Sequence, residues 1–153
     1  MASGDELRSA MRRFPSGIAV LTLPLPFGVT IGSLISVSLE PALVGVSIGH
    51  GAQAHELVRD AGGFALSVLA GDQDGLAQHF ARSVPPIAQW KGVVAREGAF
   101  GPLLDGALAW LECSLRSQHQ AGDHTLFVAA VERTELGREG LGLVYRDGGY
   151  HAA

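Results

Sequence analysis

Two long segments rich in apolar and β-branched residues dominate the second half of the chain. They cover residues 107–119 and 125–136, and a short connection that contains Gly122 and Asp123 joins them. Val, Thr, Phe and Trp favour strands, whereas Gly and Asp are typical of tight turns. We therefore predict two long β-strands joined by a turn. A pair of strands is not stable alone, so further strands must complete their sheet.

Shorter runs elsewhere in the chain supply those strands. Residues 24–28, with two prolines and a glycine, read as a turn, and Glu40 and Pro41 interrupt a second apolar stretch. Between these breaks, apolar and small polar residues partly alternate, which is typical of a strand with one face in the core. The remaining strands are predicted at residues 18–23, 29–38, 42–48, 64–69, 141–145 and 149–151.

Helical spacing of apolar residues appears only in short segments. Ser3 or Asp5 can cap the first helix, glycines at 62 and 63 end the second, and Asp72 can cap the third. These helices are predicted at residues 4–13, 52–61 and 72–80. Residues 81–105 have the composition of a loop, with a possible short strand at 90–94. The expected fold is mainly β, a closed or sandwiched antiparallel sheet with a few short helices, in one domain over residues 1–153.

Composition excludes several classes of function. The net charge of the 153 residues is −4 and there is one lysine, so no basic surface for nucleic acid is expected. Because no apolar run approaches the roughly 20 residues of a membrane span and residues 1–8 lack a signal-like core, we expect a cytoplasmic protein that does not bind membranes. The mean hydropathy of +0.24 suggests burial in a partner subunit. The single cysteine, Cys113, excludes an intrachain disulfide and is predicted to be a core residue.

The polar residues contain no familiar catalytic motif. Neither a His-Glu-x-x-His metal motif nor a Gly-x-Ser-x-Gly nucleophile elbow occurs, so we predict no metal site and no hydrolase triad. Gly49 and Gly51 precede a predicted helix, whose N-terminus suits a phosphate, but the strand pattern does not fit a parallel dinucleotide-binding sheet. His124 follows the turn between the long strands, where a rigid scaffold can aim its side chain at a ligand. On a regular strand Ser36 and Ser38 would share one face and Ser33 would lie on the other.

In order along the chain, these segments resemble the flavin reductase-like family of FMN-binding split barrels. The resemblance covers nearly the whole sequence and is most specific around the Gly-Asp-His of residues 122–124. It implies an antiparallel split β-barrel that binds FMN or FAD between the subunits of a homodimer. It also implies reduction of that flavin by NAD(P)H and delivery to a partner flavin-dependent monooxygenase. The matching segments are residues 11–22, 28–44, 63–69, 72–81, 104–113, 121–125 and 143–151.

The resemblance also implies roles for individual residues. A catalytic role falls to His124, near the flavin ring where the nicotinamide stacks. Tyr150 would cover the site, and Phe80 and Arg82 would lie near the ribityl and phosphate arm. Many family members carry hydroxyl residues where this chain has Ala52 and Ala54. The flavin ring would contact Thr30, Ile31, Gly32 and Ser33, with Ser36, Val37 and Ser38 continuing that wall, and the phosphate would meet Ala52, Gln53 and Ala54.

Hydride transfer between nicotinamide and flavin needs no protein acid or nucleophile, because the cofactors carry the chemistry. A flavin reductase and a protein that only binds flavin would therefore look alike in their polar motifs. The expected function is an NAD(P)H:flavin oxidoreductase. The alternatives are a flavin-binding protein without reductase activity and a split-barrel interaction module that has lost flavin.

Overall fold

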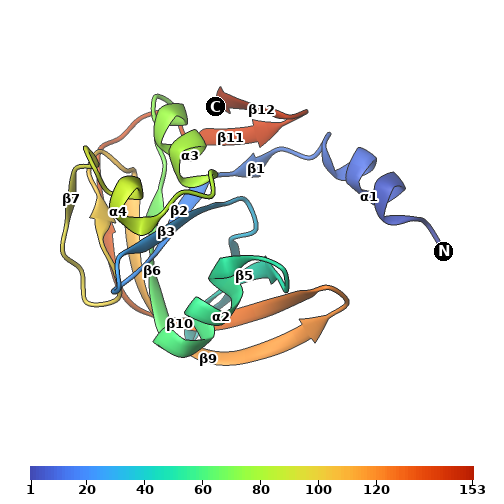
Figure 1. Cartoon of the computed structure of the whole chain (residues 1–153), viewed down its shortest axis with the longest axis horizontal. Helices are drawn as coiled ribbons and strands as arrows, with labels where there is room; N and C mark the ends of the chain where they lie inside the picture. The colour runs from blue at the N-terminus through green and yellow to red at the C-terminus, as the bar shows by residue number, and fades with distance from the viewer.

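The computed structural model describes residues 1–153 (Figure 1). Short helices lie around a mainly antiparallel β structure. The helices are α1 (Gly4–Met11), α2 (Gln53–Ala61), α3 (Asp74–Phe80) and α4 (Pro86–Gln89). The strands are β1 (Ser16–Gly17), β2 (Ala19–Leu23), β3 (Phe27–Ile31), β4 (Ile35–Leu39), β5 (Ala42–Gly49), β6 (Gly63–Val68), β7 (Ala95–Arg96), β8 (Leu103–Leu104), β9 (Ala109–Ala121), β10 (His124–Leu136), β11 (Leu143–Arg146) and β12 (Gly149–Ala152).

The predicted pair of long strands is confirmed as the β9–β10 hairpin, which extends along the lower edge of the molecule in Figure 1. Ala121 pairs with His124, and Gly122 takes a positive φ of 61° in the turn between them. An L side chain rarely adopts that conformation, so glycine suits the position. The hairpin belongs to a seven-stranded antiparallel sheet in the order β3-β2-β6-β9-β10-β5-β4. Strands β1, β11 and β12 form a second, smaller sheet.

The prediction of one strand over residues 29–38 is wrong. The chain leaves β3 at Ile31 and enters β4 at Ile35, and these two strands lie at opposite edges of the seven-stranded sheet. Ser33 lies in the crossing segment, where its hydroxyl donates to the carbonyl of Ser47 at 2.9 Å and accepts from its N–H at 3.1 Å. These bonds attach the crossing segment to β5, so the two edges are joined without pairing with each other.

Ser36 and Ser38 do not share a face, as a regular strand would have required. Ser36 pairs with Val44 and Ser38 with Leu43, so Val37 is an extra residue at a β-bulge. Consecutive residues of β5 face opposite sides of the sheet. The two serines therefore do so as well.

The predicted helices occur, with corrections at their ends. Ser3 caps α1 through a reciprocal capping box with Glu6, and Gly62 ends α2 at a φ of 69°. Asp72 does not cap α3, because Gln73 holds the N-cap position and the Asp72 carboxylate binds Arg138 instead. None of the four helices has the length and hydrophobicity required to span a membrane.

The short strand predicted at residues 90–94 is also wrong. Helix α4 ends just before this segment, and β7 begins just after it. The buried side chain of Gln89 accepts from the Gly28 N–H at 3.1 Å and donates to the Gly28 carbonyl at 2.8 Å. The Trp90 indole N–H donates to the Pro26 carbonyl at 3.1 Å. Side-chain hydrogen bonds to β3 and to the turn before it therefore anchor this part of the chain, which forms no strand.

The core has two parts. The larger lies inside the seven-stranded sheet and includes Leu21, Phe64, Phe127 and the predicted core residue Cys113, all fully buried. Burial, followed by the nearby carboxylates of Glu112 and Glu132, raises the pKa of the Cys113 thiol to about 12. The smaller part packs α3 against the main sheet around Phe80.

Candidate functional site

A groove of about 330 Å³ opens where β3, the crossing segment, the end of β5 and the start of α2 meet. The lining residues span positions 29 to 54 of the sequence. Although β3 and β5 lie toward opposite edges of the sheet, the crossing segment joins them through the bonds of Ser33 with Ser47. Six of the residues assigned to flavin by resemblance line it: Thr30, Ile31, Gly32, Ser33, Ala52 and Ala54. Four lining residues were not predicted: Val29, Ser47, Ile48 and Gly49.

The α2 end of the groove offers backbone donors. Ala52 occupies the N-cap position in an extended conformation and provides no side-chain cap. The N–H groups of Gln53 and Ala54, in the first turn, have no intrahelical acceptor. Unpaired N–H groups and the helix dipole favour an anion at such an end. This end of the groove can therefore hold a phosphate without a cationic side chain.

The β3 end of the groove presents mostly backbone and apolar atoms. The Thr30 hydroxyl donates to the Ala77 carbonyl of α3 at 2.6 Å, and the Ser33 hydroxyl binds β5. Both hydroxyls are thus committed within the protein. A flat, largely apolar ring with a polar edge suits such a surface, because backbone groups can meet its edge while apolar atoms meet its face.

His124 stands beside this groove. It pairs with Gly49 across the β5–β10 ladder, and its side chain is 49% exposed. Its Nδ1 lies 2.7 Å from a carboxylate oxygen of Asp123. This hydrogen bond, together with the charge of His124, holds the pKa of the Asp123 carboxyl below its usual range. The bond fixes the ring so that Nε2 remains free for a ligand.

The other residues assigned by resemblance are not among those that line the groove. Phe80 is 1% exposed and packs on Trp90, with ring centroids 5.2 Å apart, so it does not line the groove. Arg82 is exposed just after α3. Tyr150 stacks edge-on against Tyr145 in the β11–β12 hairpin, where burial raises its pKa. Ser36, Val37 and Ser38 lie on the edge strand β4, and Gln53 is exposed at the first turn of α2. Their roles in flavin binding stay predictions.

Two larger depressions exist on the surface. One of about 540 Å³ lies beside Trp90, and one of about 650 Å³ lies beside the β11–β12 hairpin. Neither includes a helix N-terminus or a residue next to His124. The smaller groove, where a helix N-terminus and the neighbourhood of His124 come together, is therefore the better candidate for the binding site.

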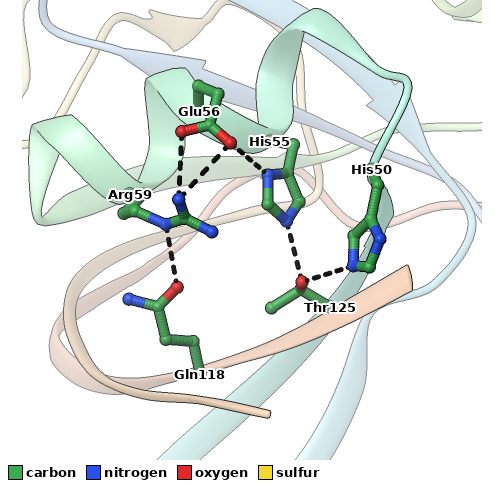
Figure 2. A network of polar contacts seen from close by, with 6 residues as sticks. All are labelled: His50, His55, Glu56, Arg59, Gln118 and Thr125. Carbon is green, nitrogen blue, oxygen red and sulfur yellow. Dashed lines mark hydrogen bonds and ion pairs between the residues drawn. The ribbon is translucent and has the colours of Figure 1, made fainter. Parts of the chain in front are cut away.

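A polar network that no sequence pattern predicted lies directly beneath the start of α2. His50 and His55 both contact the hydroxyl of Thr125, and Glu56, Arg59 and Gln118 extend the chain of contacts (Figure 2). His50 and His55 were visible as histidines around a predicted helix start. Their common partner on another strand depends on the β5–β10 register, which no local pattern reveals.

Comparisons with known proteins agree on one family. The family model described as "Flavin reductase like domain" matches residues 11–153. The chain is 40% identical over 133 residues to an NADH-dependent flavin reductase from a Rhodococcus species, covering 83% of this chain and 74% of that protein. It is 35% identical over 149 residues to the reductase component of 4-hydroxyphenylacetate 3-monooxygenase from Thermus thermophilus, covering 95% and 94%.

Solved structures give the same result. The flavin reductase component of a bacterial two-component tryptophan halogenase superimposes with a TM-score of 0.91 at 35% identity, covering 98% of each chain. The NADH:FAD oxidoreductase of Streptomyces globisporus, in complex with NAD and FAD fragments, gives a TM-score of 0.90 at 33% identity, covering 96% of this chain and 90% of that one.

Proposed function

This chain belongs to the flavin reductase-like family, and we propose that the groove between β3, β5 and α2 is where it holds the flavin. The protein is an NAD(P)H-dependent flavin reductase with the split-barrel fold, and its cofactors are FMN or FAD and a reduced nicotinamide. One observation carries the placement. The ring-facing segment of residues 30–33 and the start of α2 line a single groove, and His124 stands beside it.

In this site the flavin phosphate lies at the start of α2, and the ring lies along residues 30–33. When bound, the nicotinamide would supply the hydride with its electron pair and the flavin would supply the acceptor, so the transfer would need no acid or base from the protein. The protein therefore contributes orientation. The half-exposed His124, which lies beside the groove at Gly49, is positioned to guide the nicotinamide onto the flavin.

We further propose that flavin exchanges with solution rather than staying tightly bound. Ala52 supplies no hydroxyl at the phosphate end, and the Thr30 and Ser33 hydroxyls are occupied within the protein. Each absent charge-assisted hydrogen bond forgoes roughly 1.5–3 kcal/mol of binding. A loosely held flavin suits delivery of reduced flavin to a separate monooxygenase, the kind of system in which the Thermus thermophilus relative is a reductase component.

We propose that the working unit is a homodimer. The chain exposes 8767 Å², whereas a folded monomer of 15.9 kDa is expected to expose roughly 7,400 Å². Helix α1 stands apart from the rest of the chain in Figure 1 and has no buried residue. An isolated helix of eight residues is not stable in water, so α1 needs a surface to pack against. Its exposed Leu7 and Met11 supply the apolar face for a second copy.

The test is a steady-state assay of NADH and NADPH oxidation with added FMN, FAD or riboflavin. We expect flavin-dependent oxidation, and an isolated protein whose flavin absorbance is substoichiometric and restored by added flavin. Oxidation without dependence on any flavin would reject the function. Tight flavin binding without turnover would favour a flavin-binding protein instead.

A further inference from the structure

The hydroxyl of Thr125 is a buried junction between β10 and the start of α2. Thr125 is 2% exposed and His55 3% exposed. Thr125 Oγ1 lies 2.7 Å from His55 Nε2 and 3.1 Å from His50 Nε2. Figure 2 shows the two imidazoles converging on it, one from the loop before α2 and one from its first turn. A single hydroxyl thus holds this turn at two points.

The partners of His55 fix the direction of these hydrogen bonds. His55 Nδ1 lies 3.0 Å from the Glu56 carboxylate, which can only accept, so Nδ1 carries a proton. In a neutral His55 the Nε2 atom then accepts the proton of the Thr125 hydroxyl. That leaves the Thr125 oxygen free to accept from Nε2–H of His50. One ordered chain therefore runs from His50 through Thr125 and His55 to Glu56.

This hydrogen-bonded chain connects the start of α2 with β10, the strand that carries His124. On one side is the start of α2, where Ala52 and Ala54 line the groove. On the other side Thr125 directly follows His124, and the backbone N–H of His50 donates to the backbone carbonyl of Asp123 at 2.9 Å. Ala52 itself supplies no side-chain cap, and the bonds of His50 and His55 with Thr125 are the side-chain contacts that tie this turn to β10.

We propose that Thr125 is a positioning residue of the flavin site. Through His50 and His55 its hydroxyl sets the start of α2, and so the phosphate end of the groove, relative to the strand that carries His124. The inference rests on the proposed function, because it assumes that a flavin phosphate lies at α2. Thr125 does not touch the flavin, and it acts only through the backbone donors that it holds in place.

The experiment compares FMN with riboflavin, which has the same ring but no phosphate. Titration of intrinsic flavin fluorescence gives both dissociation constants for the wild type, Thr125→Val and Thr125→Ser. Valine keeps the volume but removes the hydroxyl, leaving His50 and His55 without their shared partner. We expect Thr125→Val, which removes both hydrogen bonds, to weaken FMN binding about tenfold and to change riboflavin binding less than about twofold. Thr125→Ser should restore the FMN preference.

A merely structural role for Thr125 would weaken FMN and riboflavin equally, and that result, or an unchanged ratio in folded Thr125→Val, would overturn the inference. If Thr125→Val does not fold, His50→Ala provides the same test at an exposed position. It should lower the FMN preference about threefold, and an unchanged preference would overturn the inference. If the wild type binds FMN no more tightly than riboflavin, the phosphate is not bound at α2, and the inference is overturned. A wild type that binds neither flavin would reject the proposed function itself.

Discussion

The imidazole of His124 lies over Gly49, where an added Cβ would stand at the ordinary contact distance of 3.6 Å from both Cε1 and Nε2. Gly49 also lines the groove. Because glycine has no side chain, none stands between the His124 ring and this part of the groove lining. The Asp123 carboxylate holds the opposite edge of the ring.

Replacing His124 with alanine should therefore affect reduction more than binding. We expect His124→Ala to slow flavin reduction by NADH about tenfold to a hundredfold, through misplacement of the nicotinamide, and to change the FMN dissociation constant less than about threefold. Stopped-flow absorbance measures the first quantity and flavin fluorescence the second. His119→Ala, on the same hairpin with its side chain hydrogen-bonded to Ser117, is the matched control. An unchanged reduction rate in His124→Ala would remove His124 from the site.

A hydroxyl at position 52 should strengthen both the helix and the site. Ala52 has the extended φ and ψ of −81° and 139° that suit a capping serine, yet it makes no cap. We expect Ala52→Ser to stabilise the protein by about 1 kcal/mol, raising Tm by roughly 2–4 °C, and to tighten FMN more than riboflavin. Gly51→Ser places a hydroxyl one residue earlier and should do neither. Calorimetry measures Tm and flavin titration measures the two affinities. Equal values in the two variants would contradict the prediction.

Phe80 should behave as a core residue. A Cβ on Gly28 would come within 2.6 Å of the Phe80 ring, which is buried and packed against Trp90. We expect Gly28→Ala to destabilise the protein by about 1–3 kcal/mol in urea unfolding. Gly75→Ala, where no atom lies within 4 Å, should be neutral or stabilising by up to about 1 kcal/mol. Equal stabilities of the two variants would contradict this packing.

The buried thiol of Cys113 should make stability fall in alkaline solution. Its pKa is about 12 in the folded protein, and an unfolded cysteine titrates near 8.5. Between these values the folded state retains a proton that the unfolded state loses. The contribution is therefore complete below about pH 8.5 and is lost as the pH rises, with a limiting slope of about 1.4 kcal/mol per unit. Urea unfolding at pH 8 and 10 should show a steeper loss for the wild type than for Cys113→Ala, and equal losses would refute the assignment.

Helix α1 should be needed for dimerisation. Leu7 and Met11 are 61% and 52% exposed in the single chain. Carboxylates at both positions could not be buried against a partner without a large desolvation cost. We expect light scattering to give twice the 15.9 kDa mass for the wild type and a single mass for Leu7→Glu with Met11→Glu. Ser9→Glu, on the same exposed helix, should remain dimeric, and a monomeric wild type would reject the dimer.

Features set by neighbouring residues could be predicted from the sequence. Gly122 and Asp123 mark the hairpin turn, and Gly62 marks the end of α2, because the required backbone conformations are local. The crossing at residues 32–34 could not be predicted, because the alternation of apolar and polar residues is the same whether the segment forms one strand or two. What fixes the crossing is the bond of Ser33 with Ser47, which is distant in the sequence. Phe80 and Trp90 are fixed in the same way, by the non-local partners Gly28 and Pro26.

The residues of the groove could be predicted only in part, because some follow from the family resemblance and others only from the fold. Resemblance to a family pointed to residues 30–33 and 52–54, but only the fold brings Ile48 and Gly49 between them. The His50–Thr125–His55 contacts required the register of β5 against β10, in which Thr125 pairs with Ile48.

The crossing segment has a mechanical consequence. Because β3 and β4 share no ladder, the two sides of the open sheet meet at residues 32–34 through the bonds of Ser33 with Ser47. A small widening of this seam would enlarge the groove while every backbone hydrogen bond of the seven-stranded sheet stays intact. Such a widening would break the two hydrogen bonds of Ser33 with Ser47, so these two bonds set the width of the groove at this point.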